Sequence, residues 1–185
     1  MPDSDQLGAV LLKLARDAIG RQFGLPSSPP ERLPELHEPG AVFVTLKCDG
    51  ALRGCIGSLE AYRPLLEDVC EHAVDAAFRD PRFPPLSRAE FDRLDIEVSL
   101  LSPPQPLAFA SEAEALDKLR PGLDGVIFSA MGRRSTFLPQ VWEDLPEPEV
   151  FLAHLKRKAG LPADYWSADV RLEVYQVRKW KEAPR

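Results

Sequence analysis

Cysteine and histidine are scarce in this chain of 185 residues, which contains three of each. The cysteines, Cys48, Cys55 and Cys70, are odd in number, and no two of them are spaced as Cys-x-x-Cys. This pattern argues against a disulfide framework and against a zinc site. We therefore expect a protein from a reducing compartment, without a bound metal.

The chain also lacks long apolar runs and basic runs. No stretch approaches the length of a membrane span, and no apolar core of the signal-peptide type lies near the N-terminus. The net charge is −6 and the isoelectric point is about 5.2, which is unfavourable for binding nucleic acid or anionic membranes. We therefore expect a cytoplasmic protein that binds neither nucleic acid nor membranes.

Several motifs of cofactor-binding and hydrolytic enzymes are absent. The chain has no phosphate-binding loop, no Gly-x-Gly-x-x-Gly, no His-Glu-x-x-His and no Gly-x-Ser-x-Gly. Gly54 and Gly57 have the Gly-x-x-Gly spacing of an RNA-binding loop, but they fall on a predicted strand of an acidic chain, so we reject that interpretation. The sequence predicts no cofactor.

What is present is typical of a globular protein, with 44% apolar and 28% charged residues. Strands and helices are mixed without a regular strand–helix repeat, which favours an α+β fold with a mainly antiparallel sheet and covering helices. We expect one sheet that consists of two hairpins together with the strands at residues 96–101 and 170–177. The predicted helices include an N-terminal one closed by Gly20 and Gly24, one at residues 64–79 and one at residues 149–159.

The first hairpin is predicted by an Asp-Gly pair between two strand-like runs. A two-residue turn at residues 49–50 gives a register with Leu46 opposite Arg53 and Val44 opposite Cys55. Because side chains alternate along a strand, Arg53 and Cys55 would then share one face, roughly 6–7 Å apart.

Cys55 and Arg53 are the leading candidates for a functional site. A neighbouring guanidinium is the kind of group that activates a thiol, which would make Cys55 a nucleophile. The alternative is a small apolar residue packed under a strand. Arg53 would anchor a carboxylate or phosphate through its fork, or else it would simply pair with Asp or Glu on the surface. Gly54 and Gly57 favour a binding role, because bare backbone lets a ligand approach.

Four further residues are candidates from their positions. His72 lies on the apolar stripe of its predicted helix, either as a satisfied core residue or as the base for Cys55. Glu97 and Ser99 project from the same face of one predicted strand, either on a solvated side or lining a cleft near Cys55. Gln140 follows a Leu-Pro step and would present its amide to a ligand. In the catalytic interpretation Glu97 and His72 act with Cys55.

Residues 52–57 (LRGCIG) also resemble the signature of the AMMECR domain family. The similarity extends to residues 80–86 (DPRFPPL), 136–141 (TFLPQV) and 157–162 (RKAGLP), which follow in the family's order. Any one motif alone is weak, but the four together are specific. They cover most of the chain.

The resemblance implies one domain over residues 1–185, with a larger lobe that contains both termini, a smaller lobe and a cleft between them. It also implies that Cys55 is an exposed thiol in that cleft. The family has no established activity, so two interpretations stay open: an enzyme that acts on a small molecule or peptide, and a non-catalytic binding or scaffold protein that uses the same groove. Family members are often grouped with a Memo-like protein and a radical-SAM protein, which suggests a shared modification pathway.

Overall fold

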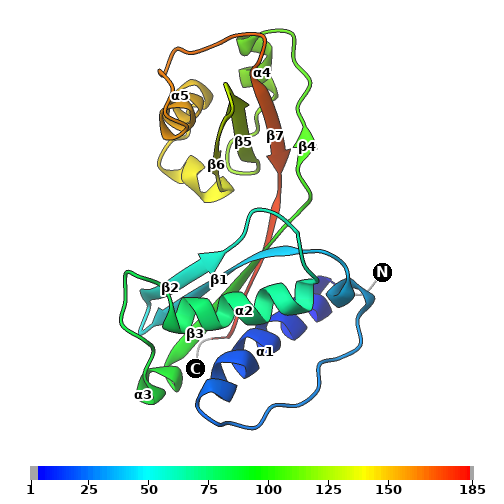
Figure 1. The fold of residues 1–185 in the computed structure, drawn as a ribbon, viewed down its shortest axis with the longest axis vertical. Coiled ribbons are helices and arrows are strands. Elements are labelled where there is room, and N and C mark those ends of the chain that lie inside the picture. Colours follow the sequence, from blue (N-terminus) through cyan, green and yellow to red (C-terminus); the bar gives the residue numbers. More distant parts are fainter. Residues whose placement is uncertain (1–3, 184–185) are drawn as a thin grey trace. The chain divides into compact units, whose positions relative to one another are not determined.

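The computed structural model describes residues 4–183, which divide into two compact units. Among these residues, unit 1 consists of residues 4–101 and 178–183, and unit 2 of residues 102–177. Each unit has its own four-stranded sheet and its own hydrophobic core (Figure 1). Within the described chain, no helix combines the length and the apolar character needed to cross a membrane. The predicted α+β class is confirmed, while the predicted cleft between two lobes stays a prediction.

Unit 1 consists of helices packed on one sheet, whose strand order is β2-β1-β3-β8. Its helical elements are α1 Ser4–Gln22, η1 Pro34–His37, α2 Leu65–Phe78 and α3 Arg88–Phe91. Its strands are β1 Ala41–Cys48, β2 Ala51–Gly57, β3 Leu94–Leu101 and β8 Val177–Lys181. In Figure 1, α1 and α2 lie against the sheet that contains β1, β2 and β3.

The core of unit 1 is formed by apolar residues that recur with two periods in the sequence, the helical period and the two-residue period of strands. Leu11, Leu14 and Ile19 recur at helical spacing on α1 and are buried, while Val42 and Val44 alternate along β1 and are fully buried. The predicted N-terminal helix, the helix at residues 64–79 and the strand at residues 96–101 are therefore confirmed. The first helix continues through Gly20 to Gln22, and the strand begins two residues earlier, at Leu94.

Both hairpins of the molecule turn at two residues with positive φ. These values are 52° at Asp49 and 80° at Gly50 in unit 1, and 50° at Met131 and 69° at Gly132 in unit 2. Two successive positive φ angles define the mirror-image turn that matches the right-handed twist of paired strands. The predicted turn of the first hairpin at residues 49–50 is confirmed.

The register of the first hairpin differs from the predicted one, because a β-bulge shifts the pairing by one residue. Cys55 lies opposite Thr45, and Gly54 lies opposite Leu46. The prediction that placed Val44 opposite Cys55 was wrong, since it assumed an unbroken ladder back from the turn.

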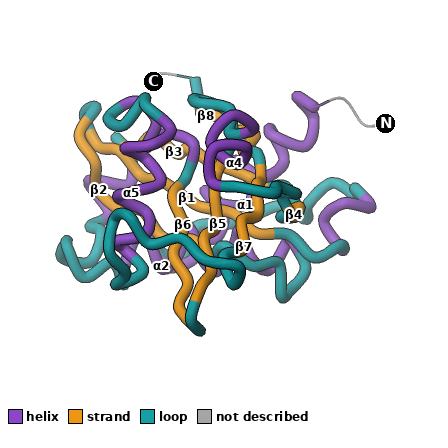
Figure 2. Tube along the Cα trace, turned by 90° about the horizontal axis from the view of Figure 1, so that it is seen from above, coloured by secondary structure: helices purple, strands orange, loops and turns teal. Residues whose placement is uncertain are grey.

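Unit 2 has a sheet of order β4-β7-β5-β6. Its strands are β4 Gln105–Pro106, β5 Gly125–Ala130, β6 Arg133–Phe137 and β7 Arg171–Tyr175. Its helical elements are α4 Glu112–Lys118, η2 Pro139–Glu143 and α5 Pro148–Lys158. Figure 2 shows β5 and β6 as neighbouring strands joined by a short turn. In the core the Trp142 ring stacks on Phe151, with 3.7 Å between the ring centroids.

The predicted strand at residues 170–177 is in fact parts of two strands in different sheets. β7 ends at Tyr175 and β8 begins at Val177. Between them Gln176 accepts a hydrogen bond from the Ser102 N–H and donates its own N–H to Ser102 Oγ, both at 2.8 Å. The expectation of a single sheet was therefore wrong. Strand β8 carries the chain on to Lys181, and its Trp180 packs against the core of unit 1.

Candidate functional site

One face of the unit 1 sheet brings together four of the eight residues selected from the sequence, which are Cys55, Gly57, Glu97 and Ser99. Alternate residues of β1 and β3 are buried against the helices, and the others point to the opposite face, which we call the polar face. Cys55, Thr45 and Glu97 lie side by side in one row across it. The next row consists of Gly57, Phe43 and Ser99. Since adjacent strands are about 4.8 Å apart, the Cα atoms of Cys55 and Glu97 are on the order of 10 Å apart.

The Cys55 thiol is half-buried, and its Sγ lies 3.3 Å from Thr45 Oγ1. The Cys55 N–H donates to Asp80 Oδ2 at 2.9 Å, and the Cys55 carbonyl accepts from Arg82 Nη2 at 3.4 Å. Because β2 is an edge strand, these two backbone groups would otherwise have no partner in the sheet. Asp80 and Arg82 therefore take the place of a neighbouring strand at Cys55.

Asp80 and Arg82 also bind each other, with 2.7 Å between Oδ2 and Nη2. The hydrogen bond from Arg82 holds the pKa of Asp80 well below its usual range, although burial of the carboxyl opposes this. The backbone N–H groups of Cys55 and Arg82 add to the lowering. The motif at residues 80–86 thus fixes the backbone of the motif at residues 52–57.

Arg53 is engaged by partners other than Cys55. Its Nε donates to Glu90 Oε1 at 2.8 Å, and its Nη2 donates to the Pro84 carbonyl at 2.8 Å. The hydrogen bond from Arg53 is the main reason why the pKa of Glu90 is lowered to about 2. Arg53 is only 8% exposed, so its pair with Glu90 is a largely buried link between β2 and α3. The interpretation of an arginine paired with an acidic residue is supported, but the pair is buried instead of lying on the surface.

Gly54 and Gly57 are explained by packing within unit 1. A Cβ on Gly54 would lie 2.1 Å from the carbonyl oxygen of Ala76 in α2. A Cβ on Gly57 would lie 2.4 Å from Cγ of Phe43, its neighbour in the row. The bare backbone that suggested ligand approach is therefore occupied by a helix at Gly54 and by an aromatic ring at Gly57.

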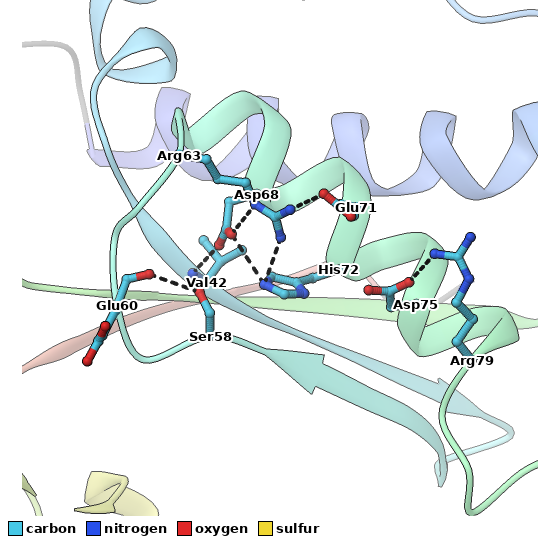
Figure 3. A network of polar contacts seen from close by, with 9 residues as sticks. All are labelled: Val42, Ser58, Glu60, Arg63, Asp68, Glu71, His72, Asp75 and Arg79. Carbon is cyan, nitrogen blue, oxygen red and sulfur yellow. Dashed lines mark hydrogen bonds and ion pairs between the residues drawn. The ribbon is translucent and has the colours of Figure 1, made fainter.

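His72 belongs to a buried polar network on α2 (Figure 3). Its Nε2 lies 3.2 Å from Asp68 Oδ1 and 3.2 Å from Arg63 Nη2. Asp68 also accepts from the Val42 N–H at 2.9 Å. Burial would raise the pKa of Asp68, but the hydrogen bonds from His72, Val42 and Arg63 outweigh it and the pKa is lowered. Within residues 4–183 the His72 Nδ1 has no hydrogen-bond partner, so the structure does not join His72 to Cys55.

Glu97 is surrounded by Lys47, Lys179 and Lys181. Burial would raise its pKa, but the hydrogen bond and charge of Lys179 and the other two ammonium groups lower it. The sequence analysis selected Glu97 and missed these lysines, since Lys179 and Lys181 lie beyond the last predicted strand, which ended at residue 177. Alternation along β1 places Lys47 on the same face as Thr45, so it would have identified that lysine.

Gln140 lies in η2 of unit 2, and its side chain is exposed. The structure therefore does not place it in the sheet that carries Cys55 and Glu97. In the part of the chain that the structure describes, no group of three or more His, Cys, Asp and Glu side chains is arranged to hold a metal ion.

Comparison with known proteins gives a consistent assignment. The model of the AMMECR1 family matches residues 12–180. A protein of Methanothermobacter thermautotrophicus is 39% identical over 188 residues, covering 98% of this chain and 97% of the relative. A protein of Thermococcus gammatolerans is 41% identical, covering 93% of this chain and 87% of the relative. The crystal structure of the uncharacterized protein PH0010 from Pyrococcus horikoshii is similar with a TM-score of 0.78 and 37% identity, covering 95% of this chain and 91% of that one. This chain belongs to the AMMECR1 family.

Proposed function

We propose that this chain binds a small molecule or a peptide segment on the polar face of unit 1 and acts on it with Cys55 as the nucleophile. The observation that carries the proposal is the row of Cys55, Thr45 and Glu97, which sets a thiol, a hydroxyl and a carboxylate side by side on three neighbouring strands. Side chains on paired strands are held more precisely than side chains on loops, which suits a reacting group.

The other two thiols are less suited to react. Burial raises the pKa of Cys70, and burial together with the Asp49 carboxylate raises the pKa of Cys48. Less of each is therefore present as thiolate at neutral pH, and the thiolate is the nucleophilic form. Cys48 and Cys70 are therefore poorer nucleophiles than an ordinary free cysteine.

Alkylation with iodoacetamide at neutral pH, followed by mapping of the adducts, tests the proposal. We expect Cys55 to be modified first in the folded protein, and we expect Cys55→Ser to remove the fast phase. Thr45→Val is a second variant that keeps the size of the side chain and removes the hydroxyl beside Sγ, so we expect it to change the rate at Cys55 alone. Modification of Cys48 or Cys70 ahead of Cys55 would contradict the proposal.

A second candidate is a non-catalytic binding or scaffold protein that uses the same face. It is favoured by the pairing of Arg53 with Glu90 and of Arg82 with Asp80, because an arginine that is already neutralised activates a thiol less. The dependence of the Cys55 alkylation rate on pH separates the two. A midpoint near the value of free cysteine, about 8.5, supports the binding protein, and a midpoint well below it supports the nucleophile.

We also propose that the chain acts in a modification pathway with a Memo-like protein and a radical-SAM protein. The support for this is the resemblance of its four motifs to the family in which such grouping occurs. Mixing the purified chain with each of these two proteins from the same organism, and measuring binding by sedimentation, tests it. Separate sedimentation of all components would count against direct contact.

A further inference from the structure

Three lysines converge on the single carboxylate of Glu97. Its oxygens lie 3.0 Å from Lys179 Nζ, 3.3 Å from Lys181 Nζ and 3.5 Å from Lys47 Nζ. The Glu97 side chain is 9% exposed, whereas those of Lys47, Lys179 and Lys181 are 39%, 39% and 62% exposed. A buried carboxylate therefore gathers three ammonium groups that remain accessible, and we call these three residues the lysine cluster.

One carboxylate cannot balance three ammonium groups. Asp95, which lies opposite Lys47 in the sheet, is a second acidic residue of this part of the polar face. Even with Asp95 included, three positive charges stand against two negative ones, in a chain whose net charge is −6. An excess of positive charge in an acidic protein marks this spot as suited to an anion.

We propose that the lysine cluster binds an anionic group, a carboxylate or a phosphate, of the ligand that reaches Cys55. Lysine ammonium groups bind such anions as point charges with three donors each. The lysine cluster surrounds Glu97, which lies in the same row as Cys55. The Cα atoms of Glu97 and Cys55 are on the order of 10 Å apart, a distance that a small molecule or a short peptide can span. The inference rests on the proposed function in one respect, because it takes the ligand whose anionic group the lysine cluster binds to be the same ligand that reacts with Cys55.

Two alkylating reagents of similar size test the inference at Cys55. Iodoacetate carries a carboxylate and iodoacetamide does not, so the ratio of their rates reports the local attraction for an anion. In Lys179→Gln/Lys181→Gln, we expect this ratio to fall about fourfold at low ionic strength, because each unit charge at about 10 Å changes the local concentration of an anion roughly twofold. A change in the ionisation of the thiol affects both reagents equally and leaves the ratio unchanged.

Lys118→Gln is the matched control. Lys118 is 43% exposed and pairs with Glu114 in unit 2, so it resembles Lys179 in exposure and pairing without belonging to the polar face. We expect the ratio in this variant to equal that of the wild type. An unchanged ratio in the double variant would overturn the inference.

Thermal unfolding provides a readout that does not depend on Cys55. Inorganic phosphate or succinate, compared with sodium chloride at equal ionic strength, should raise the melting temperature of the wild type by about 2–4 °C at saturation and leave the double variant unchanged. If phosphate raises the melting temperature, the anionic group of the ligand is a phosphate, and if succinate raises it, the group is a carboxylate. If neither anion raises the melting temperature, the inference is contradicted. If the anion raises the melting temperature while Cys55 reacts slowly, only the nucleophile of the proposed function fails.

Discussion

The backbone of Gly54 in β2 packs directly against Ala76 in α2, so that a Cβ on Gly54 would lie 2.1 Å from the Ala76 carbonyl oxygen. A helix carbonyl cannot move aside as the end of a flexible side chain can. We therefore expect Gly54→Ala to lower the free energy of unfolding by about 1–3 kcal/mol or more, as overpacked cores do. Urea unfolding measures this loss, and Gly54→Val should lose more.

Gly20 supplies the control for this prediction. It lies in α1, and a Cβ there would meet its nearest neighbour, a side-chain atom of Phe91, at 3.4 Å. Alanine is favoured over glycine within a helix by up to about 1 kcal/mol, so Gly20→Ala should not destabilise the protein. If the two alanine variants lost the same stability, close packing at Gly54 would not be the cause.

Most elements of the fold could be predicted because their signals are local. The alternation that put Glu97 and Ser99 on one face and the helix at residues 149–159 are confirmed. The bulge could not be predicted, since the run of residues 51–57 reads as a strand in either register. The break between β7 and β8 was missed because Gln176 is an ordinary strand residue, and the change of sheet depends on its distant partner Ser102.

The candidate site could be predicted only where strand alternation determines it. Alternation placed Glu97 and Ser99 on one face, and the sheet brings Cys55 into the same row as Glu97. The Glu90 partner of Arg53 could not be predicted, because an ion pair between distant segments depends on how the elements dock and nothing local singles out Glu90. The Asp68 partner of His72 was missed although the two residues lie four apart on one helix, a spacing at which side chains are neighbours.

The pair of Arg53 and Glu90 gives a second prediction. Arg53→Gln should lower the free energy of unfolding by about 2–3 kcal/mol, because it removes charge-assisted hydrogen bonds and leaves the Glu90 carboxylate in a half-buried position. Arg53→Lys should recover little, since lysine lacks the fork that binds both oxygens. Urea unfolding of these variants and of Glu90→Gln, alone and combined, should show coupling between the two sites.

The same variants test the original activation hypothesis. Since Arg53 is engaged by Glu90 and Pro84, we expect the pH dependence of Cys55 alkylation to be the same in Arg53→Gln and in the wild type. A clear shift of that profile would show that the charge of Arg53 acts on Cys55 after all.

Asp80 gives a prediction about acid stability. Its pKa in the folded protein is lowered, mainly by Arg82, below the value of about 3.9 expected in the unfolded chain. A lowered folded pKa contributes stability that is present above the unfolded value and is lost as the pH falls towards the folded one. We therefore expect Asp80→Asn to be about 2 kcal/mol less stable than the wild type at pH 7, with the difference shrinking as the pH falls from about 4 to 2.

Asp92→Asn is the control for that pH dependence. Asp92 is 64% exposed and pairs only with Arg88 on the surface, an arrangement that contributes little to stability. Its variant should follow the wild-type curve of unfolding free energy against pH. A constant difference between Asp80→Asn and the wild type over the whole range would exclude the ionised carboxylate as the source of the stability.

His72 separates a structural role from a catalytic one. His72→Leu removes a polar partner from the buried Asp68 carboxylate and from Arg63, so we expect a loss of about 1–3 kcal/mol in unfolding free energy. The amide of His72→Gln offers a donor for Asp68 and an acceptor for Arg63, so this variant should recover much of that loss. Because the contacts of His72 lie with these two residues, neither variant should change the rate of Cys55 alkylation between about pH 6 and 8, the range in which histidine titrates. Slower alkylation of Cys55 in both variants over this range would instead establish His72 as the base that the sequence suggested.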